Sequence, residues 1–220
     1  MDNTQILSHV DHTLLTATAS WTEVEQLCKE AVGFNTASVC IPPCYIGRVR
    51  KAFPGLKICT VIGFPLGYDA TPAKLAAAKT AIDDGADELD MVVNISDVKN
   101  NDFESVKNEI SALRGITEGL ILKVIVETCY LTRPEKEALC HAVTEAGADY
   151  IKTSTGFGTA GAAMEDVELF KAHIGPSVRI KASGGIRTRE DMVAFLEAGC
   201  DRLGTSSAVK ILGGGTADGY

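Results

Sequence analysis

Two lysines stand at the ends of apolar, strand-like segments, and small residues and glycine follow each of them. Lys152 precedes Thr-Ser-Thr-Gly, and Lys181 precedes Ala-Ser-Gly-Gly. Lysine is among the residues least often buried, so two of them at matching positions favour a shared site over two structural ion pairs. Two ammonium groups in a partly desolvated site disfavour each other's protonation, and an unprotonated lysine attacks carbonyl carbons. The pattern therefore predicts Schiff-base chemistry.

An aspartate lies within a third apolar segment. Asp90 stands between leucine and methionine, where a carboxylate is costly unless it is paired. It is expected to meet Lys152 or Lys181, and either to shuttle protons through a water molecule or only to balance charge; the sequence leaves both roles open. Lys123 and Glu127 have the same parity within another apolar segment, so an ion pair between these two is expected.

Glycines mark the places where helices end and strands begin. Gly33, Gly85, Gly147 and Gly199 each close an alanine-rich or amphipathic stretch and precede an apolar run. Glycine in such a place is typical of the left-handed position that follows a helix. Together with similar joints between them, these glycines predict strands at residues 9–15, 36–41, 57–63, 88–93, 120–126, 150–152, 178–181 and 202–204.

Eight strands that alternate with helices predict an α/β fold of the (β/α)8 TIM barrel type. We expect a single domain over residues 1–220, with a flexible tail at 213–220. A doubly wound open sheet shares the alternation, but the regular spacing and the lack of an early glycine-rich nucleotide motif favour the barrel. In a barrel the carboxyl ends of the strands form the catalytic face, where Lys152, Lys181 and Asp90 would converge.

Glycines and hydroxyls cluster after the last two predicted strands. Loops at these positions in TIM barrels often bind phosphate through backbone N–H groups and hydroxyls, although such glycines can also serve tight turns alone. The arginine of the cluster would add a cation. Asp11 and Thr13, at the end of the first strand, could contact substrate hydroxyls or cap a turn. The candidate phosphate ligands are Gly184, Gly185, Arg187, Gly204, Ser206 and Ser207.

The overall composition limits the class of protein. The net charge of −8 argues against a nucleic-acid surface and against binding to an anionic membrane, and no apolar stretch is long enough to span a bilayer. The seven cysteines are scattered and form no C-x-x-C pair, which favours a reducing cytoplasmic location. The four histidines have no partner at a metal-ligand spacing, so no metal site is predicted.

Motifs along nearly the whole chain resemble those of the deoxyribose-phosphate aldolases, a family of class I aldolases. The most diagnostic is the Lys-Thr-Ser-Thr-Gly run that begins at Lys152. The matching runs are residues 10–15, 37–42, 64–67, 88–94, 122–128, 151–157 and 180–187.

The resemblance implies a TIM barrel that reversibly cleaves 2-deoxy-D-ribose 5-phosphate to D-glyceraldehyde 3-phosphate and acetaldehyde, without a metal or an organic cofactor. It implies that Lys152 forms the Schiff base, that Lys181 is the neighbouring cation and that Asp90 belongs to a proton relay. Family members often end in a tyrosine that helps to move the enamine proton. Tyr220 stands there in this chain and could serve, or could be an idle end.

By the same resemblance Gly156 joins the phosphate ligands. Some members carry a lysine where this chain has Phe157, so one cationic phosphate contact is expected to be missing. Two alternatives remain open, another class I aldolase or transaldolase, and a non-catalytic barrel that binds sugar phosphates. The expected partners are a small sugar phosphate and an aldehyde, and a homodimer through the outer helices is plausible.

Overall fold

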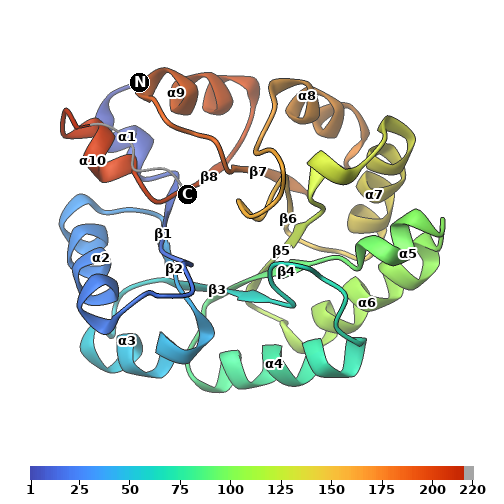
Figure 1. Cartoon of the computed structure of the whole chain (residues 1–220), viewed down its shortest axis with the longest axis horizontal. Coiled ribbons are helices and arrows are strands. Elements are labelled where there is room, and N and C mark those ends of the chain that lie inside the picture. Colours follow the sequence, from blue (N-terminus) through green and yellow to red (C-terminus); the bar gives the residue numbers. More distant parts are fainter. Residues whose placement is uncertain (216–220) are drawn as a thin grey trace.

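Eight parallel strands close into a barrel in the computed structural model, which describes residues 1–215 (Figure 1). Neighbouring strands follow each other in chain order, and β1 pairs with β8 to complete the circle. The predicted TIM barrel is confirmed and the open sheet is wrong. The strands are β1 (Val10–Thr13), β2 (Ser38–Cys40), β3 (Ile58–Ile62), β4 (Glu88–Val92), β5 (Ile121–Ile125), β6 (Tyr150–Lys152), β7 (Arg179–Ser183) and β8 (Arg202–Thr205).

Helices form a ring around the barrel, as Figure 1 shows. Capping fixes several of them in place: the Ser20 and Thr188 side chains each accept a hydrogen bond from the third residue of the helix that they precede. The helices are α1 (Asn3–Leu7), α2 (Trp21–Phe34), α3 (Ile46–Ala52), α4 (Thr71–Asp83), α5 (Ile95–Lys99), α6 (Phe103–Ile116), α7 (Arg133–Glu145), α8 (Met164–His173), α9 (Arg189–Ala198) and α10 (Ala208–Leu212), with 3-10 turns η1 (Pro43–Tyr45) and η2 (Thr128–Tyr130).

Three of the four predicted helix-ending glycines have the expected left-handed backbone. Gly85, Gly147 and Gly199 have φ angles of 103°, 75° and 111°. The assignment of Gly33 is wrong, because this residue lies inside α2 and Asn35, with φ 52°, takes the left-handed position. Asparagine is the side chain that best replaces glycine there, since its short polar group tolerates this conformation.

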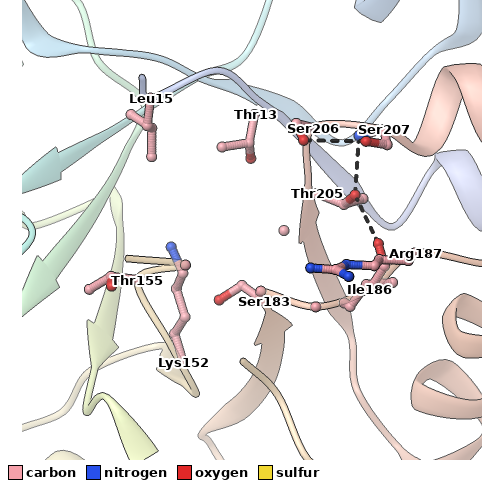
Figure 2. Close-up of a pocket in the computed structure, with 14 residues that line it drawn as sticks. Thr13, Leu15, Lys152, Thr155, Ser183, Ile186, Arg187, Thr205, Ser206 and Ser207 are labelled. Carbon is pink, nitrogen blue, oxygen red and sulfur yellow. Dashed lines mark hydrogen bonds between the residues drawn. The ribbon is translucent and has the colours of Figure 1, made fainter. Parts of the chain in front are cut away.

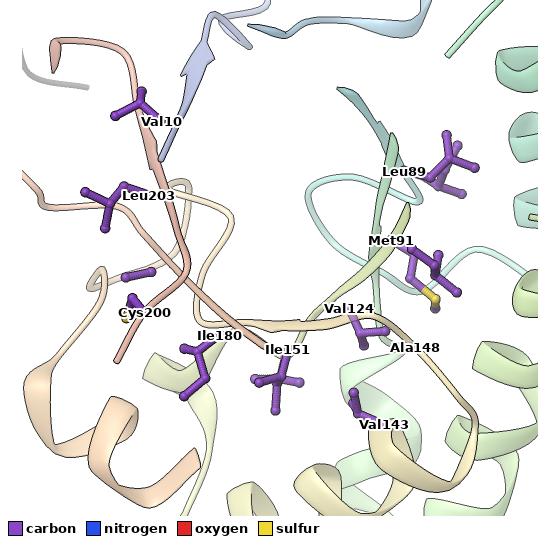
Figure 3. Close-up of a cluster of buried hydrophobic side chains, with 14 of the residues drawn as sticks. Val10, Leu89, Met91, Val124, Val143, Ala148, Ile151, Ile180, Cys200 and Leu203 are labelled. Atoms are coloured by element: carbon purple, nitrogen blue, oxygen red, sulfur yellow. The ribbon is translucent and has the colours of Figure 1, made fainter. Parts of the chain in front are cut away.

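Strand residues alternate between two environments. Figure 3 shows apolar side chains of β4 to β8, such as Met91, Val124 and Ile151, on the side of the barrel wall that faces the helices. The residues between them point inward: Glu88 and Asp90 flank Leu89 on β4, and both are buried although they carry charge. The period of two therefore separates an apolar outer layer from a charged barrel interior.

The extent of β7 determines the depth of one predicted site residue. The strand continues to Ser183, two residues beyond its predicted end, so Lys181 is a mid-strand residue. Lys152 is the last residue of β6 and is paired in register with Lys181. The two lysines are therefore neighbours, as predicted, but Lys181 lies below the mouth of the barrel.

The C-terminal tail and the absence of a membrane span were the remaining expectations. Tyr220 and most of the predicted tail lie outside the described residues. Within residues 1–215, no helix has the length and apolar character needed to cross a membrane.

Candidate active site

A pocket opens at the carboxyl ends of the strands, and all the predicted phosphate ligands line it together with Thr13 (Figure 2). Lys152 contributes its side chain from β6, and Arg187 extends toward the cavity from the loop after β7. The predicted residues in the lining are Thr13, Lys152, Gly156, Gly184, Gly185, Arg187, Gly204, Ser206 and Ser207, and the additional ones are Leu15, Thr155, Ser183, Ile186 and Thr205.

The loops after β6 and β7 pack backbone against backbone beside this pocket. The N–H of Ala162 donates to the carbonyl oxygens of Ser183 and Gly184, both at 3.1 Å. A Cβ at Gly161 would lie 2.3 Å from the carbonyl carbon of Gly184, closer than any side chain allows. Gly156, Gly184 and Gly185 have positive φ angles, which glycine adopts without strain. Glycine is thus required for two loops to meet where an anion can approach their N–H groups.

Beneath the pocket, Asp90 joins the two predicted catalytic lysines. The Nζ atoms of Lys152 and Lys181 lie 2.8 Å and 2.7 Å from the same oxygen, Oδ2 of Asp90. The side chain of Lys181 is fully buried, whereas Lys152 is 3% exposed and reaches the cavity. Asp90 was expected to meet Lys152 or Lys181, and in the structure it contacts both.

Lys181 is held as a cation. Burial by itself would lower its pKa, but Asp11 and Asp90 raise the pKa above the ordinary lysine value. Asp11 is also fully buried and hydrogen-bonds Lys181, Arg202 and the Ser38 hydroxyl, the last at 2.8 Å. Burial would raise the pKa of Asp11, and the surrounding cations, Lys181 first, lower it instead. The expectation that Asp11 contacts substrate or caps a turn is wrong, because its carboxylate is enclosed by these partners.

Lys123 forms the other side of the buried network. Its Nζ lies 2.8 Å from Oδ1 of Asp90 and 2.6 Å from Glu88, so the predicted ion pair with Glu127 is wrong. Burial would lower the pKa of Lys123, but Asp90 and other anionic groups raise it. Arg202 completes the circle at 3.2 Å from Glu88. Glu127 instead accepts hydrogen bonds from the loop after β6.

Carboxylates and cations are equal in number in the buried network beneath Lys152. The members are three carboxylates, Asp11, Glu88 and Asp90, and three cations, Lys123, Lys181 and Arg202. Each of the three cations has a raised pKa, and the lysines hold the pKa of Asp90 well below its usual range against the effect of burial.

Two buried groups have donor atoms close enough to share a metal ion. They are Cys40 with Cys59 and Asp90, and Asp11 with Cys59 and Glu88, each with ligand atoms within 4.8 Å of one another. In both groups the carboxylate oxygens already accept hydrogen bonds from lysine or arginine. The positive side chains around them oppose a further cation, so the donor sets do not suit a resident metal.

The sequence interpretation missed Glu88 and Arg202. A signal was present, because each lies two positions before a recognised site residue, Asp90 or Gly204, on the same strand. Inward parity predicts that such residues share the barrel interior. Cys59 was missed as well; its Sγ lies 3.1 Å from Oδ1 of Asp90.

Comparisons with known proteins agree with this geometry. A model of the DeoC/LacD family aldolases matches residues 5–208. A deoxyribose-phosphate aldolase of Clostridium botulinum (strain Alaska E43 / Type E3) is 58% identical over 221 residues, covering 100% of both chains. One from Clostridioides difficile (strain 630) is 54% identical over 208 residues, covering 94% of this chain and 95% of that protein.

Solved structures give the same result. A putative deoxyribose-phosphate aldolase from Coccidioides immitis superimposes with a TM-score of 0.94 and 41% identity, covering 97% of this chain and 87% of that one. The deoxyribose phosphate aldolase from Aeropyrum pernix, described as a unique tetramer, has a TM-score of 0.90 and 35% identity, with coverage of 96% and 91%.

Proposed function

Since the chain belongs to the DeoC/LacD family of aldolases, we propose that it cleaves 2-deoxy-D-ribose 5-phosphate reversibly to D-glyceraldehyde 3-phosphate and acetaldehyde. One observation carries the mechanism: Lys152 reaches the pocket that Arg187 and the glycine loops line, while the buried cation Lys181 shares its carboxylate partner, Asp90. The enzyme is accordingly a carbon-carbon lyase of the Schiff-base class.

The pocket orients the substrate by its phosphate. The glycine loops after β6 and β7 offer backbone N–H groups, and Ser206 and Ser207 offer hydroxyls. Arg187 adds one positive charge at the rim, while Phe157 packs edge to face on Phe64 where some relatives carry a lysine. Phosphate bound on this side leaves the aldehyde carbon to approach Lys152. The Thr13 hydroxyl donates to the carbonyl of Asp11 and can accept a hydrogen bond from a substrate hydroxyl.

Lys152 is the proposed nucleophile. Its unprotonated amine adds to the C1 aldehyde, and loss of water gives an iminium ion. The C2–C3 bond then breaks: its electrons neutralise the iminium as an enamine, and the C3 hydroxyl loses a proton to become the aldehyde of glyceraldehyde 3-phosphate. Protonation of the enamine at C2 and hydrolysis of the imine release acetaldehyde and restore the amine.

Asp90 acts in this proposal chiefly by holding charge. Both of its oxygens already accept hydrogen bonds, Oδ1 from Lys123 and Oδ2 from Lys152 and Lys181. Proton transfer then proceeds through water beside Lys152 and Lys181, and Tyr220, which lies outside the described residues, stays a candidate for protonating the enamine.

The test is reductive trapping with borohydride in the presence of substrate or acetaldehyde. Mass spectrometry should locate the adduct on Lys152, and Lys152→Met should lose both adduct and turnover, whereas Lys29→Met, a surface control, should keep both. An adduct on another lysine would refute the assignment. Product analysis separates other class I aldolases, which do not release acetaldehyde, and phosphate binding without a reducible imine would support the non-catalytic alternative.

We also infer that the chain forms a homo-oligomer, as the tetrameric Aeropyrum pernix relative does. Val32 and Phe34 on the outer helix α2 are 59% and 49% exposed, which supports a contact there. The homodimer expected from the sequence is the simplest such state, and light scattering after size-exclusion chromatography tests it.

All seven cysteines lie in the described part of the chain and are free, which supports the proposed cytoplasmic location.

A further inference from the structure

Glu127 is a buried carboxylate beside the pocket that has no ion-pair partner among residues 1–215. It lies between β5 and η2, is 2% exposed, and has a left-handed backbone with φ 55°. Such a backbone is uncommon for a residue other than glycine. Burying a carboxylate without an ion-pair partner is unfavourable unless hydrogen bonds compensate. The hydrogen bonds of Glu127 therefore show which segment its side chain stabilises.

Within residues 1–215 the hydrogen bonds to this carboxylate come from two residues, and the stronger set comes from Thr155. The Thr155 N–H donates to Oε1 and Oε2 at 3.2 and 3.3 Å, and the Thr155 hydroxyl donates to Oε2. The Cys129 thiol adds a weak contact at 3.9 Å. Burial raises the pKa of Glu127, while the bonds from Thr155 act in the opposite direction.

Thr155 transmits this contact to the phosphate loop. Its Oγ1 accepts a hydrogen bond from the N–H of Phe157 at 3.0 Å while its hydroxyl proton points to Glu127. These bonds close a turn around Gly156, whose φ is 89°, and both Thr155 and Gly156 line the pocket. Figure 2 shows Thr155 at the edge of the cavity next to Lys152.

The same loop passes directly over the carboxylate. A Cβ at Gly158 would lie 3.1 Å from Cδ of Glu127 and 2.7 Å from Sγ of Cys129. The N–H of Thr128, next to Glu127, donates to the carbonyl of Thr153 at 2.9 Å. The segment after β5 is thus attached to the loop after Lys152 at two points, Thr153 and Thr155.

We propose that Glu127 is a positioning residue for substrate phosphate: acting through Thr155, its carboxylate sets the shape of the loop that carries Gly156. A carboxylate suits the task because it only accepts hydrogen bonds, and both an N–H and an O–H point at it. This inference rests on the proposed aldolase activity and adds a residue that governs recognition of the phosphorylated over the unphosphorylated sugar.

The experiment compares 2-deoxyribose 5-phosphate with 2-deoxyribose in the wild type and in Glu127→Gln. The amide presents a donor to groups that are themselves donors, so the loop shifts. We expect kcat/KM to fall by about 10-fold for the phosphorylated sugar, mainly through KM, and by less than about 3-fold for the unphosphorylated sugar. Trapping of acetaldehyde on Lys152 by borohydride should proceed at the wild-type rate.

Variants of the partner show whether the effect passes through Thr155. Thr155→Val, which lacks the hydroxyl, should reproduce the selective loss; Thr155→Ser should restore wild-type behaviour; and the effects of Glu127→Gln and Thr155→Val should not multiply in the double variant. Cys129→Ala, which leaves the Thr155 contacts intact, is the matched control and should stay within about 2-fold.

Equal losses on both sugars in either variant, or multiplying effects in the double variant, would overturn the assignment. The Thr155 series carries the test alone if Glu127→Gln does not fold. A wild type that releases no acetaldehyde from 2-deoxyribose 5-phosphate would instead refute the proposed function, so the two failures are distinguishable.

Discussion

Replacing Lys181 with methionine removes a buried positive charge and keeps a side chain of similar length. In the native barrel Lys181 is bonded to Asp11 and Asp90, and it shares Oδ2 of Asp90 with Lys152. Without it the network has three carboxylates and two fixed cations, so a proton on Lys152 restores neutrality. We therefore expect Lys181→Met to inactivate the enzyme at neutral pH by keeping Lys152 charged.

The size of the effect follows from the spacing of the two amines. Ammonium groups that bind one carboxylate oxygen are about 5 Å apart, and at an effective dielectric constant of about 20 their repulsion amounts to about 3 kcal/mol. That energy corresponds to about two pH units, so kcat/KM near pH 7 should fall by about 100-fold in Lys181→Met, and the acidic limb of its pH profile should move upward by about two units.

The assay is the pH profile of kcat/KM for 2-deoxyribose 5-phosphate cleavage between pH 5 and pH 10, with the rate of borohydride trapping as a second readout. Lys181→Arg keeps the charge and is the matched control, whose acidic limb should stay near that of the wild type. A loss in Lys181→Met that is equal at every pH, in a variant that circular dichroism shows to be folded, would refute the charge argument.

Two further predictions test the network and the loops. Asp11→Asn should destabilise the fold by about 3–5 kcal/mol at pH 7, because Lys181 and Arg202 lose a buried partner. Folding lowers the pKa of Asp11, so the stabilisation by its ionised carboxylate is complete above the ordinary carboxyl pKa and fades as the pH falls. The difference in Tm between Asp11→Asn and the wild type should therefore narrow below about pH 4. A difference in Tm that does not change with pH would contradict this coupling of protonation to folding. Gly161→Ala should weaken phosphate binding, measured by calorimetry, because the added methyl group would collide with the backbone of Gly184. Gly33→Ala is the control, because this residue lies inside α2 and a Cβ there has no atom within 4 Å. It should leave binding unchanged and stabilise the fold by up to about 1 kcal/mol. Equal binding by both glycine variants would show that the loop contact is dispensable.

The fold could be predicted from the sequence because its signals are local. Each strand is a short apolar run next to a turn, and the glycines at 85, 147 and 199 end their helices by a conformation that few other residues adopt. Their regular alternation leaves few topologies, and the closed barrel is the one found. Strand ends were less certain, since nothing local in the sequence shows that β7 continues from Lys181 to Ser183.

Most residues of the proposed phosphate pocket could also be predicted, because in this fold the loops that hold them follow from strand number. The contact between Lys181 and Asp90 was expected as well, but the second carboxylate partner of Lys181 was not. The bond from Lys181 to Asp11 joins residues 170 positions apart, and the bond from Arg202 to Asp11 spans 191 positions. Such contacts depend on the stagger of strands around a closed barrel, which fixes the height of each inward side chain and cannot be read from any one segment.

That stagger also supports Lys152 over Lys181 as the nucleophile. Lys181 has two carboxylate partners and full burial, and a Cβ at Gly204 would lie 3.1 Å from its Cε, so the chain above it closes tightly. Lys152 has one carboxylate partner and reaches the cavity from the last position of its strand. β6 ends at Lys152, whereas β7 continues for two residues beyond Lys181. Lys181 is therefore a fixed cation within its strand, and the amine of Lys152 can meet a substrate. The two lysines look equivalent in the sequence, and their proposed roles differ because Lys181 is enclosed by two carboxylates whereas Lys152 opens onto the cavity.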